Sequence, residues 1–289
     1  MDDRLFVSSF TGEITEILDG GKTRTLLPGG LNWPLDLTVD GDGNLFVADG
    51  TNTFQLADDG TLTTIGMMFS PGYPGVVRGL SSVGGGEFIA SNTNGKVSRY
   101  RPAAMEEDVL AEGLDPQLYG VAVAPSGAVA VAELGAGRVV SIKGGDVQEL
   151  ASGLQDPMGV AFAADGSCLV SESSGGRVAV LDGNGGAETL LDGLKCPQGI
   201  HVDGDRLYVV DAGERALVSY DMKRKRRGTI ASNLPVGPPA GVTAKPLLGI
   251  QPFSGPQGPF AGIARGPDGT LYVSADGEGS VLALRRSGS

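Results

Sequence analysis

Acidic side chains end several short apolar runs in this chain, and they are the residues most able to do chemistry. Asp49, Glu133, Glu172 and Asp211 each close such a run, as in LYVVD. Clustered carboxylates can hold Ca²⁺ or Mg²⁺, which take several oxygen ligands, or can act as general bases where burial raises their pKa values. We expect Asp36, Asp49 and Asp211 as candidate metal ligands, and Glu133 and Glu172 as candidate catalytic residues. The alternative is that these acids bind the amides of turns.

Three further side chains suit substrate binding or proton transfer. Arg78 can donate to a carboxylate, lactone or carbonyl oxygen, or it can form a salt bridge to one of the acids. Tyr119 can donate to a substrate oxygen or simply pack. His201 is the only histidine and has an ordinary pKa near neutrality, so it is a candidate acid or base; a structural histidine is the alternative.

The elements that position these residues belong to a repeat. Residues 197–221, PQGIHVDGDRLYVVDAGERALVSYD, contain three short apolar runs separated by Asp-Gly and polar turns, which is typical of consecutive antiparallel strands. Similar first strands carry a glycine, or in one case an aspartate, about every 40 residues. The positions of this slot are Asp36, Gly79, Gly120, Gly159, Gly199 and, after a longer interval, Gly262.

This period, with several strands per repeat, predicts an all-β protein, a β-propeller of four-stranded antiparallel blades. Six first strands favour six blades, whereas seven second strands, which begin at Leu5, Leu45, Phe88, Val129, Leu169, Leu207 and Leu271, favour seven. The N-terminal unit lacks a first strand and the C-terminal unit lacks a fourth. We expect one domain over residues 1–289, with a terminal strand completing the last blade.

The start of the first strand and the end of the second strand must lie on one face of the propeller, because the two strands are antiparallel. The residue before the glycine slot therefore forms an inner ring at the channel mouth. Its members are Leu35, Arg78, Tyr119, Met158, Gln198 and Ala261. Within this ring we expect Arg78, Tyr119, Met158 and Gln198 to bind substrate.

Two long connections, residues 66–77 and 235–259, lead from an outer strand to the next inner strand and thus reach the same face. They are too apolar for disorder. We expect lids that bring Tyr73 and Phe253 to an apolar pocket; stabilising packing is the alternative.

Composition narrows the choice of partners. The 289 residues include 48 glycines and carry a net charge of −12, which disfavours nucleic acid and anionic membranes as partners. No apolar run approaches the ~20 residues of a membrane span, and we expect a cytoplasmic protein.

Cys168 and Cys196 are expected to be free thiols. The basic run KRKRR, residues 223–227, is a solvated turn or a docking site for an acidic partner.

The repeats PQGIHVDGDRLYVVDAGERALVSYD and PMGVAFAADGSCLVSESSGGRVAVLD resemble NHL repeats. The whole chain is similar to the wider group of NHL, gluconolactonase and virginiamycin B lyase propellers. Gluconolactonase-like members imply lactone hydrolysis with a divalent ion held by Glu, Asn and Asp at inner-strand starts, a triad that the inner ring of this chain does not carry. Virginiamycin B lyase is similar in its Tyr-Gly strand openings, here Tyr119-Gly120, and in acids such as Glu133 and Glu172. Its use of Mg²⁺ and a histidine at a strand opening is the further implication, although His201 lies further along its strand.

These observations lead to two expectations of function. The first is a hydrolase or lyase that acts on a small, partly apolar, oxygen-rich molecule such as a lactone or cyclic ester, with possible help from Ca²⁺ or Mg²⁺. The second is a noncatalytic NHL-like propeller that binds a small ligand or a protein.

Overall fold

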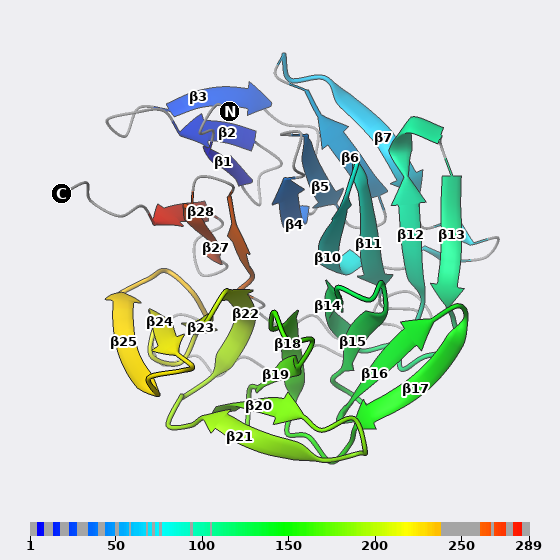
Figure 1. Ribbon diagram of the computed structural model, residues 1–289. Helices are drawn as coiled ribbons and strands as arrows, with labels where there is room; N and C mark the ends of the chain where they lie inside the picture. Colours follow the sequence, from blue (N-terminus) through cyan, green and yellow to red (C-terminus); the bar gives the residue numbers. More distant parts are fainter. Residues whose placement is uncertain are drawn as a thin grey trace.

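The computed structural model describes most of the chain. The described residues are 5–8, 14–17, 23–27, 34–39, 44–49, 52–57, 59–67, 69–70, 73–74, 77–92, 95–104, 106–237, 261–266, 269–275 and 280–284. They form antiparallel sheets that follow one another around a central axis, with the short 3-10 helix η2 (Pro102–Ala104) as an addition (Figure 1).

Five of the sheets have four strands, paired in sequence order. Their strands are β4 (Pro34–Val39), β5 (Leu45–Asp49), β6 (Asn52–Leu56) and β7 (Leu62–Met67); β10 (Val77–Gly84), β11 (Glu87–Asn92), β12 (Val97–Arg101) and β13 (Glu106–Ala111); β14 (Leu118–Val123), β15 (Val129–Glu133), β16 (Arg138–Lys143) and β17 (Asp146–Ala151); β18 (Pro157–Phe162), β19 (Cys168–Glu172), β20 (Arg177–Leu181) and β21 (Ala187–Leu191); and β22 (Pro197–Asp203), β23 (Arg206–Asp211), β24 (Ala216–Asp221) and β25 (Arg226–Ala231). Each sheet is one blade, so the predicted propeller of four-stranded blades is confirmed.

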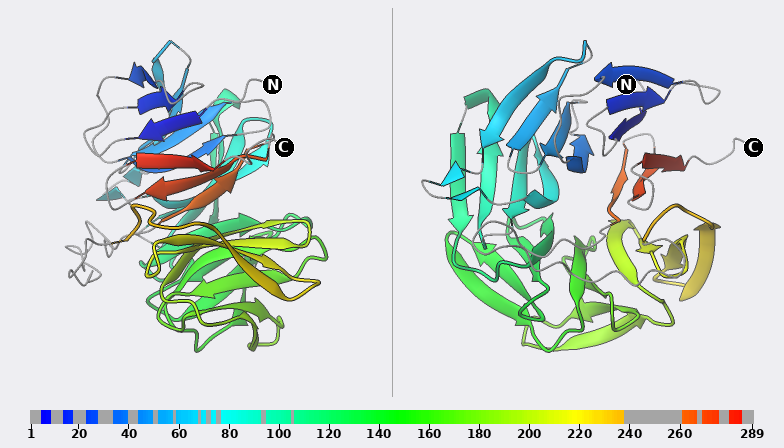
Figure 2. Two further views of the ribbon diagram at one scale, coloured as in Figure 1. Left: turned by 90° about the vertical axis from the view of Figure 1, so that its left-hand side faces the viewer. Right: turned by 180° about the vertical axis from the view of Figure 1, so that it is seen from behind.

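Two three-stranded sheets occupy the ends of the chain. They consist of β1 (Leu5–Ser8), β2 (Ile14–Ile17) and β3 (Thr23–Leu27), and of β26 (Ile263–Arg265), β27 (Leu271–Ala275) and β28 (Ser280–Leu284). Strands β1 and β28 contact each other, and the two sheets lie side by side where the ring closes (Figures 1 and 2). The described residues therefore comprise five complete blades and two incomplete ones. The N-terminal unit lacks a first strand and the C-terminal unit lacks a fourth, as predicted, whereas completion of the last blade by a terminal strand is not seen among the described residues.

The core lies between neighbouring blades. One cluster joins Ala130 and Ala132 of β15 to Val160 of β18 and Val170 of β19, and comparable clusters occupy the next interfaces. Strand β15 reads VAVAE and is buried along its whole length, because blades cover both of its faces. The outer strand β17 is exposed over most of its length, which explains its polar sequence.

Four glycines of the repeated slot, Gly79, Gly120, Gly159 and Gly199, lie where consecutive inner strands approach closely. A Cβ atom on Gly120 would lie 2.5 Å from the carbonyl oxygen of Met158, and one on Gly159 would lie 2.5 Å from that of Gln198. Real Cβ atoms do not approach backbone so closely, so a larger residue would force the blades apart. The glycine repeat therefore sets the spacing of the inner strands around the axis.

The first of the two long connections contains regular structure. Strand β7 continues to Met67, further than the sequence suggested, and β8 (Phe69–Ser70) pairs with β9 (Tyr73–Pro74) in a two-stranded hairpin. Most of the second connection, residues 238–260, lies outside the described residues.

Cys168 and Cys196 are free, as expected. Over the part of the chain that is described, helices long and apolar enough to cross a membrane are absent.

Candidate functional site at the inner-strand starts

The inner ring is built from irregular backbone at the start of each inner strand. Pairing with the second strand shifts between Val77 and Gly79 in β10, and corresponding shifts span the Tyr119, Met158 and Gln198 positions in the next three blades. A bulge leaves its residue out of the regular ladder and re-aims the side chain. The predicted inner ring thus occupies equivalent bulges in four consecutive blades.

Arg78 and Tyr119 meet across the first of these blade interfaces. The guanidinium carbon of Arg78 lies 5.3 Å from the centre of the Tyr119 ring, and the two residues are only 7% and 2% exposed. This is the geometry of a cation–π contact. Burial lowers the pKa of Arg78, an effect that Tyr119 partly opposes, yet a guanidinium stays protonated at any physiological pH.

Gln198 is fixed to the following blade. Its Oε1 atom accepts a 2.6 Å hydrogen bond from the amide of Ala261, and the residue is 3% exposed. Met158, at the equivalent place in the previous blade, is also buried. The structure therefore places Arg78, Tyr119, Met158 and Gln198 on consecutive inner strands, in the order that the sequence predicted.

Two serines that were not among the candidate site residues hold this ring in place. Ser91 donates a 2.7 Å hydrogen bond to the carbonyl of Tyr119. Ser171 donates to the carbonyl of Gln198 at 2.5 Å and accepts from the amide of Gly159 at 2.8 Å. Each serine stands one residue before the end of a second strand, and this recurrence is the signal by which they could have been found.

The two strand-end glutamates are buried and bound within their own blades. Glu133 and Glu172 are both 0% exposed. Arg177 donates to Glu172 at 2.6 Å and the amide of Gln155 donates to it at 2.8 Å. Glu133 has an ion pair with Arg138 in the same arrangement.

The sequence carries a signal for these pairs, because each glutamate is followed by an arginine at the start of the next strand. Asp211 has an alanine, Ala216, opposite it instead. Its carboxylate accepts from the backbone amides of Lys195, Cys196 and Glu214 at 3.0, 2.9 and 3.3 Å. All three acids thus make the structural contacts named above as their alternative role.

Within the described residues, no three His, Cys, Asp or Glu side chains come together in a way that could hold a metal ion. Asp211 fits a metal site poorly because its oxygens already accept three amides. Asp36 lies in β4 and Asp49 at the end of β5, but their side chains lie outside the described part. Their role as metal ligands stays a prediction.

His201 lies away from the inner ring, in the middle of β22. It stands opposite Tyr208 of β23, with ring centres 6.5 Å apart. Burial lowers its pKa, the nearby Asp203 opposes this, and Arg265 of the next inner strand adds to the lowering. A neutral imidazole is therefore favoured, and its catalytic role stays a prediction.

The predicted lid residues lie mostly outside the described part of the chain, so their role stays a prediction. The backbone of Tyr73 belongs to β9, while its side chain and the whole of Phe253 lie outside the described residues. At the opposite end of blade β22–β25, a cavity of about 270 Å³ is lined by Asp203, Asp205, Arg206, Tyr208, Asp221 and Arg224.

Comparison with solved structures supports the propeller. A streptogramin B lyase has a TM-score of 0.73 at 12% identity, covering 98% of this chain and 89% of that one. A catalytically inactive variant of virginiamycin B lyase from Staphylococcus aureus, with quinupristin, has a TM-score of 0.70 at 13% identity, covering 94% and 87%. The nidogen/laminin complex contains a chain with a TM-score of 0.60 at 18% identity, covering 78% and 92%. No family model and no curated protein matches the sequence. At these identities the likeness is one of fold, and the chain has the β-propeller fold that NHL-type proteins and these lyases share.

Proposed function

We propose that the inner ring of Arg78, Tyr119, Met158 and Gln198 binds a small, partly apolar, oxygen-rich molecule, and that the protein is a lyase or hydrolase acting on it. The observation that carries this proposal is the buried guanidinium of Arg78, held over the Tyr119 ring at the inner-strand starts. A cation in a site shielded from water interacts strongly with a developing negative charge. A lactone or cyclic ester is the first substrate class to test.

The chemistry divides between the residues of the ring. Arg78 would donate to the carbonyl oxygen and stabilise the oxyanion or enolate that forms there, while Tyr119 orients the same group. Met158 would contact the apolar part of the substrate. Proton transfer falls to Glu133, Glu172 or His201 as separate candidates, because each lies on an inner or second strand of a blade that contributes to the ring.

A divalent ion is a further part of the proposal, with Ca²⁺ or Mg²⁺ held by Asp36 and Asp49. Such an ion would polarise a carbonyl oxygen. Elemental analysis of the purified protein and calorimetric titration with each ion test this part. Stoichiometric binding that Asp36→Asn removes would support it, and absence of binding would overturn it without affecting the role of Arg78.

The main test is turnover of a panel of lactones and cyclic esters, with quinupristin included because a structural neighbour was solved with it. We expect Arg78→Met to lower kcat/KM about 100-fold and Tyr119→Phe to lower it less. Arg99→Met is the matched control, because Arg99 is a half-exposed arginine on β12 that pairs with Glu87. Equal losses in both arginine variants would overturn the assignment to Arg78.

A noncatalytic binding propeller is the second candidate. The observation that favours it is that Glu133, Glu172 and Asp211 are each held by arginine or backbone donors, which leaves them poorly placed as free bases. The nidogen/laminin neighbour is a propeller in a protein complex. Calorimetric binding of a panel member without turnover, lost in Arg78→Met, would select this function over the enzyme.

A further inference from the structure

The outer strand β25 differs in charge from the outer strands of the preceding blades. Strand β13 begins with Glu106, Glu107 and Asp108, and β17 contains Asp146 and Glu149. Strand β25 begins with Arg226 and Arg227, directly after Lys223, Arg224 and Lys225 in the turn. Five consecutive cations thus stand on the rim of a chain whose net charge is −12.

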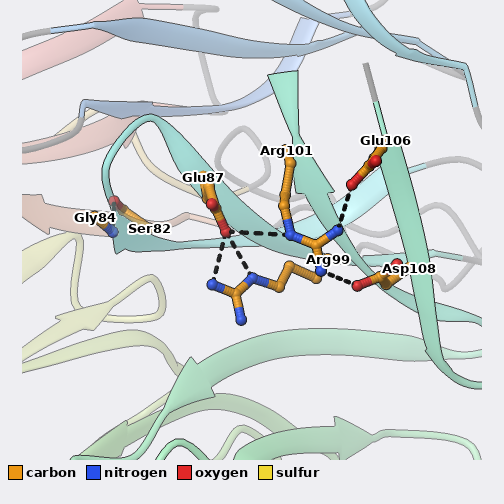
Figure 3. A network of polar contacts seen from close by, with 7 residues as sticks. All are labelled: Ser82, Gly84, Glu87, Arg99, Arg101, Glu106 and Asp108. Atoms are coloured by element: carbon orange, nitrogen blue, oxygen red, sulfur yellow. Dashed lines mark hydrogen bonds and ion pairs between the residues drawn. The ribbon is translucent and has the colours of Figure 1, made fainter. Parts of the chain in front are cut away.

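The three acids of β13 and Glu149 of β17 are already paired within their blades. Arg101 pairs with Glu106 at 2.9 Å and also with Asp108, while Lys96 pairs with Glu107. Figure 3 shows how Arg101 reaches Glu106 and Asp108 from β12. In the next blade, Arg138 lies 3.5 Å from Glu149. These strands are therefore weak partners for the cations of a second copy.

The cations of the basic turn are only partly matched. Lys223 pairs with Asp205 at 2.7 Å and Arg224 with Asp221 at 2.9 Å. Arg227 donates to the carbonyl of Gly193. Across the described part of the chain, no carboxylate lies within ion-pair distance of Lys225 or Arg226. These two charges have only solvent or a binding partner to face.

The turn presents these cations in a fixed arrangement. Asp221 accepts from the amide of Arg224 at 2.8 Å, and the amide of Met222 donates to the carbonyl of Asp205 at 2.9 Å. Lys225 has a left-handed φ of 51°, which turns the chain back into β25. Because these bonds order the backbone of the turn, its ordering would cost little entropy on binding.

Strand β25 also has an open edge. It is the last strand of its sheet and is exposed along most of its length, and it lies on the outside of the ring (Figure 1). Ile230 is 42% exposed. An outer strand presents unpaired backbone groups to which an extended segment can add.

We propose that the edge of β25 and its basic turn, residues 223–231, form a docking surface for an extended acidic segment of a partner protein. Backbone pairing along β25 would hold the segment, and its carboxylates would face Lys225 and Arg226. A nucleic acid or anionic membrane would need a larger basic surface than this narrow strip on an acidic molecule provides. The basic turn is at the opposite end of the blade from the inner-strand starts, and β25 is the outermost strand of its sheet, so the surface is separate from the inner ring.

The test uses a fluorescein-labelled heptapeptide of alternating glutamate and valine, titrated with the full chain by fluorescence anisotropy. We expect binding that weakens with salt and that falls about tenfold in the double variant Lys225→Glu, Arg226→Glu. Lys143→Glu is the matched control, because Lys143 is exposed at the corresponding turn between β16 and β17 and should bind the peptide as the unmodified chain does. Thermal unfolding should be the same in all three proteins.

Hydrogen exchange tests the mode of binding. The peptide should slow exchange of backbone amides in β25 and leave those of β17 unchanged. Absence of peptide binding, equal binding by the double variant, or binding without protection of β25 would each overturn the proposal. Tighter binding of labelled duplex DNA or of phosphatidylserine vesicles, or self-association by sedimentation, would also overturn it if the double variant abolished that interaction.

Discussion

The inner ring and the strand-end acids lie at the same end of the blades, yet they differ in what the repeat requires of them. The acids Glu133, Glu172 and Asp211 are chemically alike, and each binds amides or an arginine within the repeat. The inner ring changes from arginine to tyrosine, methionine and glutamine in consecutive blades. Positions that repeat in chemistry support the blades, and the varying positions of the inner ring are those to which we assign ligand binding.

The largest expected effect tests the slot glycines that set the spacing of the inner strands. In Gly159→Ala the new Cβ would lie 2.5 Å from the carbonyl of Gln198 and 3.1 Å from the hydroxyl of Ser171. We expect the free energy of unfolding to fall by about 3 kcal/mol, measured by urea denaturation. Gly228→Ala is the control, because its Cβ would meet only the Ser219 hydroxyl at an ordinary 3.4 Å. Equal stabilities would show that the blades can separate to admit a side chain.

The second prediction tests whether the strand-end acids are structural and the inner ring is the site. Glu172→Ala removes the acceptor of the Gln155 amide and the partner of Arg177. We expect the free energy of unfolding to fall by about 2 kcal/mol. The loss is no larger because water can solvate the partly exposed arginine. In Glu172→Gln, which keeps one acceptor, the loss of stability should be smaller. If Glu172→Gln abolished turnover at full stability, the acids and not the ring would be the site.

The third prediction concerns Ser171, which binds the backbone of the inner ring from a second strand. Ser171→Ala would leave the amide of Gly159 without its acceptor and release the carbonyl of Gln198, with an expected loss of about 1 kcal/mol. The neighbouring blade already has Ala132 at this position, so the fold tolerates the change. Ligand affinity should fall in Ser171→Ala but not in Ser98→Ala, a buried serine on β12 away from the ring. Equal ligand affinities in Ser171→Ala and Ser98→Ala would show that Ser171 does not position the inner ring.

The smallest expected effect is a pH dependence that comes from His201. Because its native pKa is lowered from the model-compound value of 6.5 by burial, the unfolded chain takes up the proton first as the pH falls. Stability contributed by the neutral imidazole is complete above pH 6.5 and is lost as the pH falls toward the native pKa. His201→Phe should reduce this acid-side loss in thermal melts. If His201→Phe lost as much stability at acid pH as the unmodified chain, the loss would come from carboxylates instead.

The sequence was sufficient to predict the propeller, because the glycine slot and the turns recur at a steady interval. It also predicted the order of Arg78, Tyr119, Met158 and Gln198, since strand direction follows from the repeat. The partners of Glu133 and Glu172 were missed, because they depend on cross-strand register, in which Glu172 stands opposite Arg177. The regular structure of β8 and β9 was missed as well, since two-residue strands have no periodicity to detect.

The bulges at the starts of the inner strands have a consequence for engineering. Because these positions stand outside the regular ladder, exchanges at residues 78, 119, 158 and 198 keep the glycine and serine contacts between blades, while an exchange of Gln198 also removes the acceptor of the Ala261 amide. A combinatorial library limited to these four codons would sample new ligands on one scaffold, and it is small enough to be screened in full. The same property makes the fold a ready substrate for directed evolution.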